Sequence, residues 1–560
     1  MRRFSMLLAG AFALGACAPA RTPVAGPADV PPPPRAAEPV EPAEPEGADP
    51  ADAASTAPEH WWLLDAGTDG VRGTSVERAY RELLAGKRPA RQVVVAVIDG
   101  GIDLDHQDLD DNLWVNEDEV AGNGKDDDGN GYIDDVHGWN FIGGPDGRQV
   151  DHDTYEVTRL YARYRERYEG ADPDTLTGAA RAEYERFRKV EEAYQTERQE
   201  TTQMLQQVRA MDAAVDRFTA LLRQHLGVDS LTVERVRAIR SPRRDVQQAR
   251  QVYLQLAANG VTPAMIDEEL ERLDGLMQYG LNPSFDPRPI VGDDYTDASE
   301  RRYGNADVEG PDPFHGTHVA GIIGAERGNG IGVDGIAPAV RIMAVRAVPD
   351  GDERDKDVAN AIRYAVDNGA DIINMSFGKP FSPRKDVVDA AVRYADEHGV
   401  LMIHAAGNDG ADLGAEPSFP SRVYEDGDTA RNWIEVGASS WQDADHLAAP
   451  FSNYGDHEVD VFAPGVAIVS TIPDDGYGPA SGTSMAAPVV TGLAALLMAY
   501  YPDLDAADVK RIILESATRY AEQPVVRPGE DGGQVPFGRL SATGGIVNAY
   551  AAIRMAEGMR

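Results

Sequence analysis

The sequence predicts an α/β fold built around a mostly parallel β-sheet. Six short runs are rich in β-branched and other apolar residues, and each has the length of a buried strand: 91–99, 340–348, 370–377, 399–406, 433–439 and 458–464. Amphipathic helical patterns, "DVANAIRYAVDNG" and "DVVDAAVRYADEHG", separate three of these runs. Strands that alternate with helices in this way form parallel sheets, because the chain must cross back before it starts each parallel neighbour.

The first expected strand, "RQVVVAVID" (91–99), is apolar without alternation, which predicts cover on both faces of the sheet. It ends at Asp99, so a carboxylate stands at the carboxyl end of a buried strand. The runs "VRIMAVRAV", "ADIINMSF", "GVLMIHAA", "WIEVGAS" and "EVDVFAP" follow in chain order. We expect all of them to belong to the same sheet.

Residues 154–280 differ from the rest of the chain, because they show helical periods and no strand-like run. One long helix is expected to end at Gly227 and to carry a seam of residues spaced three and four apart, with a polar break in its middle. The seam consists of Phe187, Val190, Tyr194, Glu197, Thr201, Met204, Val208, Met211, Val215, Phe218 and Leu222. Ser241-Pro242 and Thr262-Pro263 each have the form of a helix cap followed by proline at the first helical position.

We therefore predict a coiled-coil-like α-helical arm at residues 143–289, packed antiparallel on itself. It interrupts an α/β domain that comprises residues 59–142 and 290–557. Two roles remain open for the arm. It is either a structural support or a surface that docks a helical partner or gates substrate.

The first 17 residues have the features of an export signal. "MRRF" is positively charged, and "SMLLAGAFALG" is apolar but too short for a membrane-spanning stop-transfer helix. Leu14-Gly15-Ala16-Cys17 has the form of a bacterial lipobox, which implies lipidation of Cys17 and an exported protein anchored to a membrane in the periplasm or at the cell surface. Ordinary cleavage after "ACA" is the alternative. Cys17 is the one cysteine of the chain, so no internal disulfide is possible.

Residues 18–58 are rich in proline, alanine and glutamate and predict a tether, with order beginning near Trp61-Trp62. The hydrophobic share of 42% is enough for a large core. The formal net charge of −40 repels a phosphate backbone and argues against nucleic acid as a partner, while it suits hard cations.

An aspartate, a histidine and a serine occur in that order along the chain, each in a short motif. Asp99 ends the first strand, His315 opens "HGTHVAG", and Ser484 lies in "SGTSMAAPVVTG". A serine hydroxyl becomes a nucleophile when a base removes its proton, which is the role of histidine near neutral pH. The histidine needs a buried carboxylate that fixes its tautomer and stabilises its cation. Ser484 opens an apolar helix, where the helix dipole and backbone N–H groups favour developing negative charge.

These motifs and their order resemble those of the subtilisin-like serine proteases, or subtilases, over roughly residues 60–142 and 290–557. The resemblance implies a three-layer α/β fold and hydrolysis of peptide bonds through an acyl-enzyme. It implies that Asn408 in "HAAGND" donates its side-chain amide to the oxyanion. It further implies two walls of the substrate site: an edge formed by Ser376, Phe377 and Gly378, which pairs with substrate backbone, and an open apolar pocket formed by Ala405, Ala406 and Gly407.

Two further histidines, His106 and His318, are expected to be packing residues. Gly100 departs from the family, which usually has a hydroxyl residue after the catalytic aspartate. The long separation of Asp99 from His315 also departs from compact subtilases, and the helical insertion accounts for it.

The stretch "DDDGNGYID" from Asp126 matches the start of an EF-hand-type calcium loop. The expected ligands are the side chains of Asp126, Asp128 and Asn130 and the carbonyl of Tyr132, at positions 1, 3, 5 and 7 of the loop. His137 replaces the glutamate of position 12, so Asp134 or Asp135 is expected to complete the shell. An acidic loop without a metal is the alternative.

The resemblance implies a second calcium site where Asp108 meets the loop "RGNGIGV". The implied ligands there are the side chains of Asp108 and Asn329 and the carbonyls of Arg327, Ile331 and Val333. Zinc is not expected, because the chain has no His/Cys cluster with ligand spacing.

Together these features predict an exported, lipid-anchored, calcium-stabilised serine endopeptidase that acts on protein or peptide substrates. The first rival is a catalytically silent lipoprotein scaffold that binds a partner through the helical arm. The second is a peptidase of narrow specificity that the arm regulates.

Overall fold

The computed structural model describes residues 57–559 except 443, 530 and 531. The predicted signal, Cys17 and nearly all of the tether therefore lie outside the described residues. Residues 207–269 form one compact unit, and residues 59–206 together with 270–559 form the other. The larger unit contains a nine-stranded sheet with the strand order β10-β13-β7-β6-β5-β4-β1-β3-β2.

The sheet is parallel throughout except at one edge, where β10 and β13 are antiparallel. Each of the six predicted strand runs contains one of its strands. The strands are β1 (Val93–Asp99), β2 (Gly138–Asn140), β3 (Val340–Arg346), β4 (Ile372–Met375), β5 (Leu401–Ala405), β6 (Trp433–Ser439), β7 (Val461–Pro464), β10 (Thr518–Arg519) and β13 (Gly545–Ile546). Two hairpins accompany them, β8 (Ile468–Ile472) with β9 (Gly476–Ala480) and β11 (Pro524–Val526) with β12 (Gln534–Pro536).

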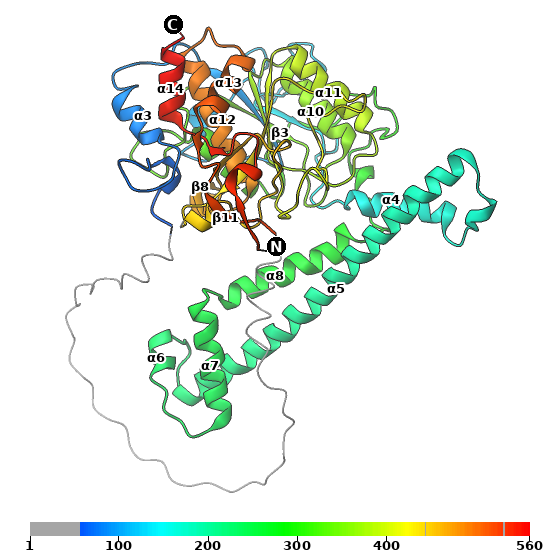
Figure 1. Cartoon of the computed structure of the whole chain (residues 1–560). Coiled ribbons are helices and arrows are strands. Elements are labelled where there is room, and N and C mark those ends of the chain that lie inside the picture. The colour runs from blue at the N-terminus through cyan, green and yellow to red at the C-terminus, as the bar shows by residue number, and fades with distance from the viewer. Residues whose placement is uncertain (1–56, 443, 530–531, 560) are drawn as a thin grey trace. The chain divides into compact units, whose positions relative to one another are not determined.

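Helices cover both faces of the sheet, which gives the predicted three layers (Figure 1). α10 (Asp355–Asp367) and α11 (Lys385–Glu397) pack on one face. The other face is covered by α9 (Phe314–Gly324) and α12 (Thr483–Tyr500), and α13 (Ala506–Ser516) and α14 (Ala549–Glu557) contact α12, while α3 (Val76–Glu82) contacts α14. Short 3-10 helices lie at Trp61–Leu63, Asp110–Asn112, Pro173–Thr175, Arg288–Ile290, Ala444–His446 and Phe537–Arg539.

α12 is apolar on all sides because it is the central helix of its layer. Among the described residues it is the one helix long and apolar enough to cross a membrane, and 89% of that stretch is buried inside the protein. A helix without a polar face is typical of such a buried position.

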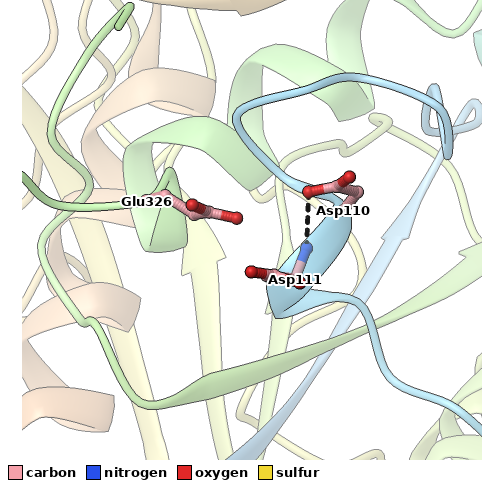
Figure 2. Close-up of side chains that lie close together, drawn as sticks. All are labelled: Asp110, Asp111 and Glu326. Carbon is pink, nitrogen blue, oxygen red and sulfur yellow. Dashed lines mark hydrogen bonds between the residues drawn. The ribbon is translucent and has the colours of Figure 1, made fainter. Parts of the chain in front are cut away.

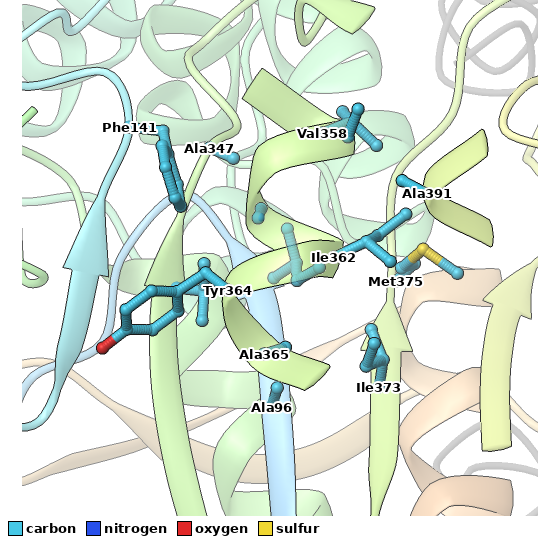
Figure 3. Packing of buried hydrophobic residues seen from close by; sticks show 14 of the residues in the cluster. Ala96, Phe141, Ala347, Val358, Ile362, Tyr364, Ala365, Ile373, Met375 and Ala391 are labelled. Atoms are coloured by element: carbon cyan, nitrogen blue, oxygen red, sulfur yellow. The ribbon is translucent and has the colours of Figure 1, made fainter. Parts of the chain in front are cut away.

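The packing of α10 fixes the two strands that lead into the site. Its apolar stripe, with Val358, Ile362 and Ala365, lies over alternate residues of β1 and β4 (Figure 3). Residues three or four apart on the helix therefore contact residues two apart on each strand. β1 lies between β3 and β4, so the strand order reverses there, and ligands of open α/β sheets bind at the carboxyl ends of strands at such a point.

Two helices enter the larger unit from the predicted arm. α4 (Glu156–Tyr168) and the first part of α5 (Gly178–Leu226) share an apolar cluster with residues 276–281 and Phe381. Tyr194 Oη donates to the carbonyl of Leu281 over 3.1 Å, so the returning chain lies against α5 there. Because α4 packs in the larger unit, the compact unit 207–269 is shorter than the predicted insertion 143–289.

In the smaller unit, the end of α5 packs on α6 (Val233–Arg237) and α7 (Arg244–Ala258). The predicted seam is largely buried along α5, with Glu197 exposed and Met204 half-buried. α5 ends at Leu226, and Gly227 follows with a φ of 66°, as predicted.

Two helices were predicted to begin at a proline, and one of the two does so. Pro263 begins α8 (Pro263–Gly275), which a π-helical turn at Leu276–Gly280 extends, and Thr262 Oγ1 accepts the N–H of Met265 over 3.3 Å. The prediction that a helix begins at Pro242 was wrong, because α7 begins at Arg244. Ser241 Oγ instead accepts the N–H of Arg243 in a turn before the helix.

Candidate active site

The carboxylate of Asp99 and the imidazole of His315 are hydrogen-bonded. Nδ1 of His315 lies 2.8 Å from Oδ1 and 3.0 Å from Oδ2 of Asp99. Asp99 is 3% exposed at the end of β1, whereas the His315 side chain at the start of α9 is 42% exposed. The contact holds the proton on Nδ1, which leaves Nε2 as the basic nitrogen.

The pKa of His315 is raised above its ordinary value. Burial lowers this pKa, but the negative charge of Asp99 and its hydrogen bond raise it by more, and Asp312 adds to the upward shift. Because the His315 ring is partly exposed, burial counts for less than the contact with Asp99, and the net shift of the His315 pKa is upward. The pair therefore stabilises the imidazolium that forms when His315 takes a proton.

Gly316 allows His315 to approach Asp99. A Cβ atom at Gly316 would lie 2.1 Å from the carbonyl oxygen of Gly101 and 3.2 Å from Cβ of Asp99. A side chain at this position would force α9 away from the end of β1. The glycine of "HGTH" thus serves the geometry of the site.

Ser484 is the second residue of α12 and is bonded to the segment that follows β4. Its Oγ donates to the carbonyl of Ser376 over 3.0 Å, and Ser376 Oγ donates to the carbonyl of Ser484 over 2.9 Å. Proton transfer to His315 requires the Ser484 hydroxyl to turn away from Ser376. Catalytic hydrogen bonds commonly complete themselves in this way only when substrate binds.

Asn408 follows β5 and directs one end of its amide toward the same place. Its Oδ1 accepts hydrogen bonds from Thr483 N at 2.9 Å and Thr483 Oγ1 at 3.1 Å, so Nδ2 is the end left to donate. A Cβ atom at Gly482 would lie 3.6 Å from both Asn408 Nδ2 and the backbone nitrogen of Ser484. Asn408 Nδ2 and the N–H of Ser484 thus lie close to the same point beside Gly482, an arrangement that an oxyanion hole requires.

The turn that presents Asn408 is held by Asn453, a residue that carries no motif in the sequence. Asn453 is 3% exposed; its Oδ1 accepts the N–H groups of Asp409 and Ala411, and its Nδ2 donates to the carbonyl of Ala406. Gly407 has a φ of 102°, and a Cβ there would lie 2.4 Å from Asn453 Nδ2. A lone asparagine in a loop gave no signal of this role.

The two predicted substrate walls lie beside these groups. On one side, Ser376 is buried, Phe377 is half-buried and Gly378 is exposed. On the other, Ala405 and Ala406 are buried and Gly407 is half-buried. Their contacts with substrate remain predictions.

The two remaining histidines are packing residues, as predicted. His318 is buried, its Nε2 lies 3.1 Å from the carbonyl of Gly478, and burial lowers its pKa to about 4. His106 is also fully buried, with Nε2 3.1 Å from the carbonyl of Gly476.

The predicted calcium loop brings three carboxylates together, those of Glu119, Asp128 and Asp135, with ligand oxygens within 4.8 Å of one another. Two oxygens are buried without a hydrogen-bond partner, Oε2 of Glu119 and Oδ1 of Asp126. Burial raises the pKa of Asp135 to about 6, and the charge of Asp128 acts in the same direction. Carboxylates this close together, of which Asp135 is buried and Asp128 exposed, and the two unpartnered oxygens fit a hard cation.

The cluster of carboxylates differs from the predicted ligand set in two residues. Asp134 has a φ of 55° and its carboxylate accepts the N–H groups of Asn123 and Gly124, so Asp135, the other residue expected to complete the shell, is the one that joins the cluster. Glu119, which the spacing of the loop does not include, also accepts the N–H groups of Asp127 and Asp128 through Oε1.

Of two other predicted ligands, Asn130 directs its amide nitrogen toward the carboxylates. Asn130 donates Nδ2 to Asp128 and Asp135. The ring of Tyr132 packs against Trp139, Phe141 and Tyr364. To bind a cation, Asn130 would have to turn its amide oxygen toward the carboxylates. The carbonyl of Tyr132 remains a predicted ligand.

The second implied calcium site is compact. The Asp108 carboxylate accepts Nδ2 of Asn329 at 2.7 Å and the N–H of Val333 at 3.0 Å. The carbonyls of Arg327, Ile331 and Val333 remain predicted ligands. Close by in the chain, the carboxylates of Asp110, Asp111 and Glu326 gather at the surface (Figure 2).

Comparison with known proteins gives one family. A model described as the subtilase family matches residues 90–532. The chain is 42% identical over 238 residues to a thermophilic serine proteinase of Bacillus sp. (strain AK1), an alignment that covers 42% of this chain and 53% of that protein. It is 39% identical over 212 residues to subtilisin NAT of Bacillus subtilis subsp. natto, covering 36% and 50%.

A third relative, subtilisin DY of Bacillus licheniformis, is 36% identical over 251 residues, which cover 44% of this chain and 84% of that protein. The chain spans about half the length of the first two relatives. The family match, by contrast, extends over most of this chain, from β1 to β11 and beyond. The chain belongs to the subtilase family.

Proposed function

We propose that this protein is a serine endopeptidase that hydrolyses peptide bonds in proteins through an acyl-enzyme. The observation that carries the proposal is the hydrogen-bonded pair of Asp99 and His315 on the same edge of the sheet as Ser484 and Asn408. Each of the four residues stands at the end of a strand or the start of a helix, where rigid elements hold it.

The proposed reaction begins with attack by Ser484 Oγ on the scissile carbonyl carbon. His315 Nε2 takes the hydroxyl proton, and the carboxylate of Asp99 stabilises the resulting cation. The oxygen of the tetrahedral intermediate accepts hydrogen bonds from Asn408 Nδ2 and the N–H of Ser484. The C–N bond breaks, His315 gives its proton to the leaving amine, and water, activated by His315, hydrolyses the ester of Ser484.

Hydrolysis of a protein substrate such as casein tests this proposal. The chain is expected to cleave it at neutral to mildly alkaline pH, and Ser484→Ala is expected to abolish cleavage while its melting temperature stays within about 2 °C. A folded wild-type chain without hydrolytic activity would instead favour the rival, a silent scaffold. The hydrogen-bonded pair of Asp99 and His315, with Ser484 and Asn408 both present, argues for the enzyme over the scaffold.

We further propose that calcium stabilises the enzyme. Glu119, Asp126, Asp128 and Asp135 would hold the ion, which supplies a counter-charge to carboxylates that otherwise repel one another. Asp135 accepts the hydroxyl of Tyr364 on α10 over 2.6 Å, so the loop is connected to the helix that packs on β1. Chelation is expected to lower the melting temperature, and calcium is expected to restore it.

Export and lipid anchoring through Cys17 are also part of the proposal and rest on the sequence. Fractionation of cells that express the full chain tests them. The protein is expected in the membrane fraction, and Cys17→Ser is expected to release it. Recovery of the unaltered chain in the soluble fraction would contradict the anchor and leave ordinary cleavage after "ACA".

A further inference from the structure

The segment that follows β4 connects the nucleophile with the helical insertion within four residues. At its start, Ser376 exchanges two hydrogen bonds with Ser484. At its end, the backbone of Lys379 pairs with Phe419, through N–O distances of 3.0 and 2.9 Å. Gly378 and Pro380 on either side of Lys379 are exposed, yet the Lys379 side chain is turned inward and is 2% exposed.

The buried ammonium of Lys379 is held by groups from two directions. Its Nζ donates to Glu156 Oε2 at 3.0 Å and to the carbonyl of Glu353 at 2.7 Å, and it lies 2.8 Å from Asp355 Oδ1. Glu156 belongs to α4, the first helix of the insertion, and its side chain is 4% exposed. Burying such charges is tolerated only because they are paired.

Of the two carboxylates beside Lys379, Glu156 belongs to the insertion and Asp355 belongs to α10. Asp355 also accepts hydrogen bonds from other donors. Ser382 Oγ donates to Asp355 Oδ1 at 3.0 Å, and Arg384 N donates to Oδ2 at 2.8 Å. Glu156 is itself oriented by Arg159, whose Nη2 lies 2.7 Å from Oε2.

A second contact between the insertion and this segment is apolar. Phe381 packs against the cluster formed by α4, the start of α5 and residues 276–281. The segment from Ser376 to Phe381 is thus bonded to the nucleophile at one end and to the insertion at the other. It is also the segment expected to pair with the backbone of an extended substrate.

We propose that the Lys379–Glu156 ion pair makes α4 a positioning element for the substrate-binding segment 376–378, so that the insertion sets the affinity for extended peptides. The inference rests on the proposed function as an endopeptidase. Side chains alternate in direction along an extended segment, so a fixed Lys379 also fixes which way the N–H and C=O groups of Gly378 and Ser376 point. Glu156 is a positioning residue and does not touch substrate.

Glu156→Gln tests the proposal, because it keeps the shape and removes the charge. With peptides that extend four residues before the scissile bond, KM is expected to rise about tenfold, which is the worth of one main-chain hydrogen bond. The value of kcat is expected to change less than threefold. With a single-residue ester, which does not reach Gly378, both constants are expected to stay within twofold.

A matched control is Asp357→Asn in α10. Asp357 is a fully buried carboxylate whose partners are Arg288 and Tyr303. This variant is expected to lower the melting temperature without changing KM for either substrate. Lys379→Met is expected to reproduce the effect of Glu156→Gln, and Lys379→Arg, which retains the charge, is expected to restore most of the affinity for extended peptides.

If the charge variants do not fold, Phe381→Ala provides the same test through the apolar contact, since this side chain is only half-buried. An active wild-type chain whose folded variants all keep their KM for extended peptides overturns the inference alone. A rise in KM of equal size for the ester also overturns it, because the damage would then lie at Ser484. A wild-type chain inactive on every substrate overturns the proposed function and the inference with it.

Discussion

Replacement of Asn408 by alanine separates transition-state stabilisation from substrate binding. The structure assigns the two ends of the amide to different partners. Oδ1 accepts two hydrogen bonds from Thr483, and Nδ2 is left for the oxygen of the tetrahedral intermediate. Asn408→Ala therefore removes one donor to the oxyanion and two acceptor bonds that orient it.

The two losses have different sizes and different readouts. Loss of a donor to an oxyanion lowers kcat by about 10²–10³-fold, or about 2.7–4 kcal/mol, a range measured on subtilisin, which is a relative of this chain. Loss of two neutral hydrogen bonds lowers the free energy of unfolding by about 1–3 kcal/mol. KM is expected to change less than threefold, because the full charge on the oxygen forms only in the transition state.

The assay is steady-state hydrolysis of a chromogenic peptide together with thermal unfolding. Thr483→Val is the matched control, because it removes the Oγ1 contact with Asn408 and retains the backbone one, and its kcat is expected to fall about tenfold or less. If Asn408→Ala keeps kcat within about threefold of the wild type while Ser484 remains essential, the assignment of the oxyanion hole is wrong.

The remaining predictions concern His315, the predicted calcium site and Gly316. The pKa of His315 is raised by Asp99, so kcat/KM is expected to rise with pH through a value above 6.5, and Asp99→Asn should move this limb to lower pH. The stability from this pair is present below the unfolded pKa and is lost as pH rises through the folded one, which urea unfolding at several pH values measures. Glu119→Gln is expected to remove most of the calcium-induced rise in melting temperature, and an equal rise in wild type and variant would contradict the ligand assignment. Gly316→Ala is expected to lower kcat/KM at least 100-fold because its Cβ meets the Gly101 carbonyl, whereas Gly275→Ala, with open space around its Cβ, should leave activity unchanged.

Much of the candidate active site was predictable from the sequence, because its parts are local signals at the ends of helices and strands. Asp99 is the last residue of a continuously apolar strand, and Ser484 lies two residues after Gly482, the N-cap of an apolar helix. The order of Asp99, His315 and Ser484 along the chain then matched that of the subtilases. The polarity pattern of α5 and its end at Gly227 were similarly local.

The contacts that sequence reasoning missed join residues far apart in the chain or without a motif. Glu119 precedes the calcium loop and has no fixed spacing to it, so only folding brings it to Asp128. Lys379 and Glu156 are 223 residues apart, and each alone has the appearance of a surface charge. The predicted helix start at Pro242 was wrong because a turn stabilised by Ser241 precedes α7. Such a turn has the same sequence signature as a helix cap.

The proposed mechanism requires Ser484 to be the nucleophile of a triad with His315 and Asp99. Labelling of the folded chain with a fluorophosphonate, followed by peptide mapping, tests it most directly. One label per chain is expected, on Ser484, with none on Ser484→Ala and labelling at least 100-fold slower on His315→Ala. A label on another residue, or equal labelling of Ser484→Ala, would contradict it.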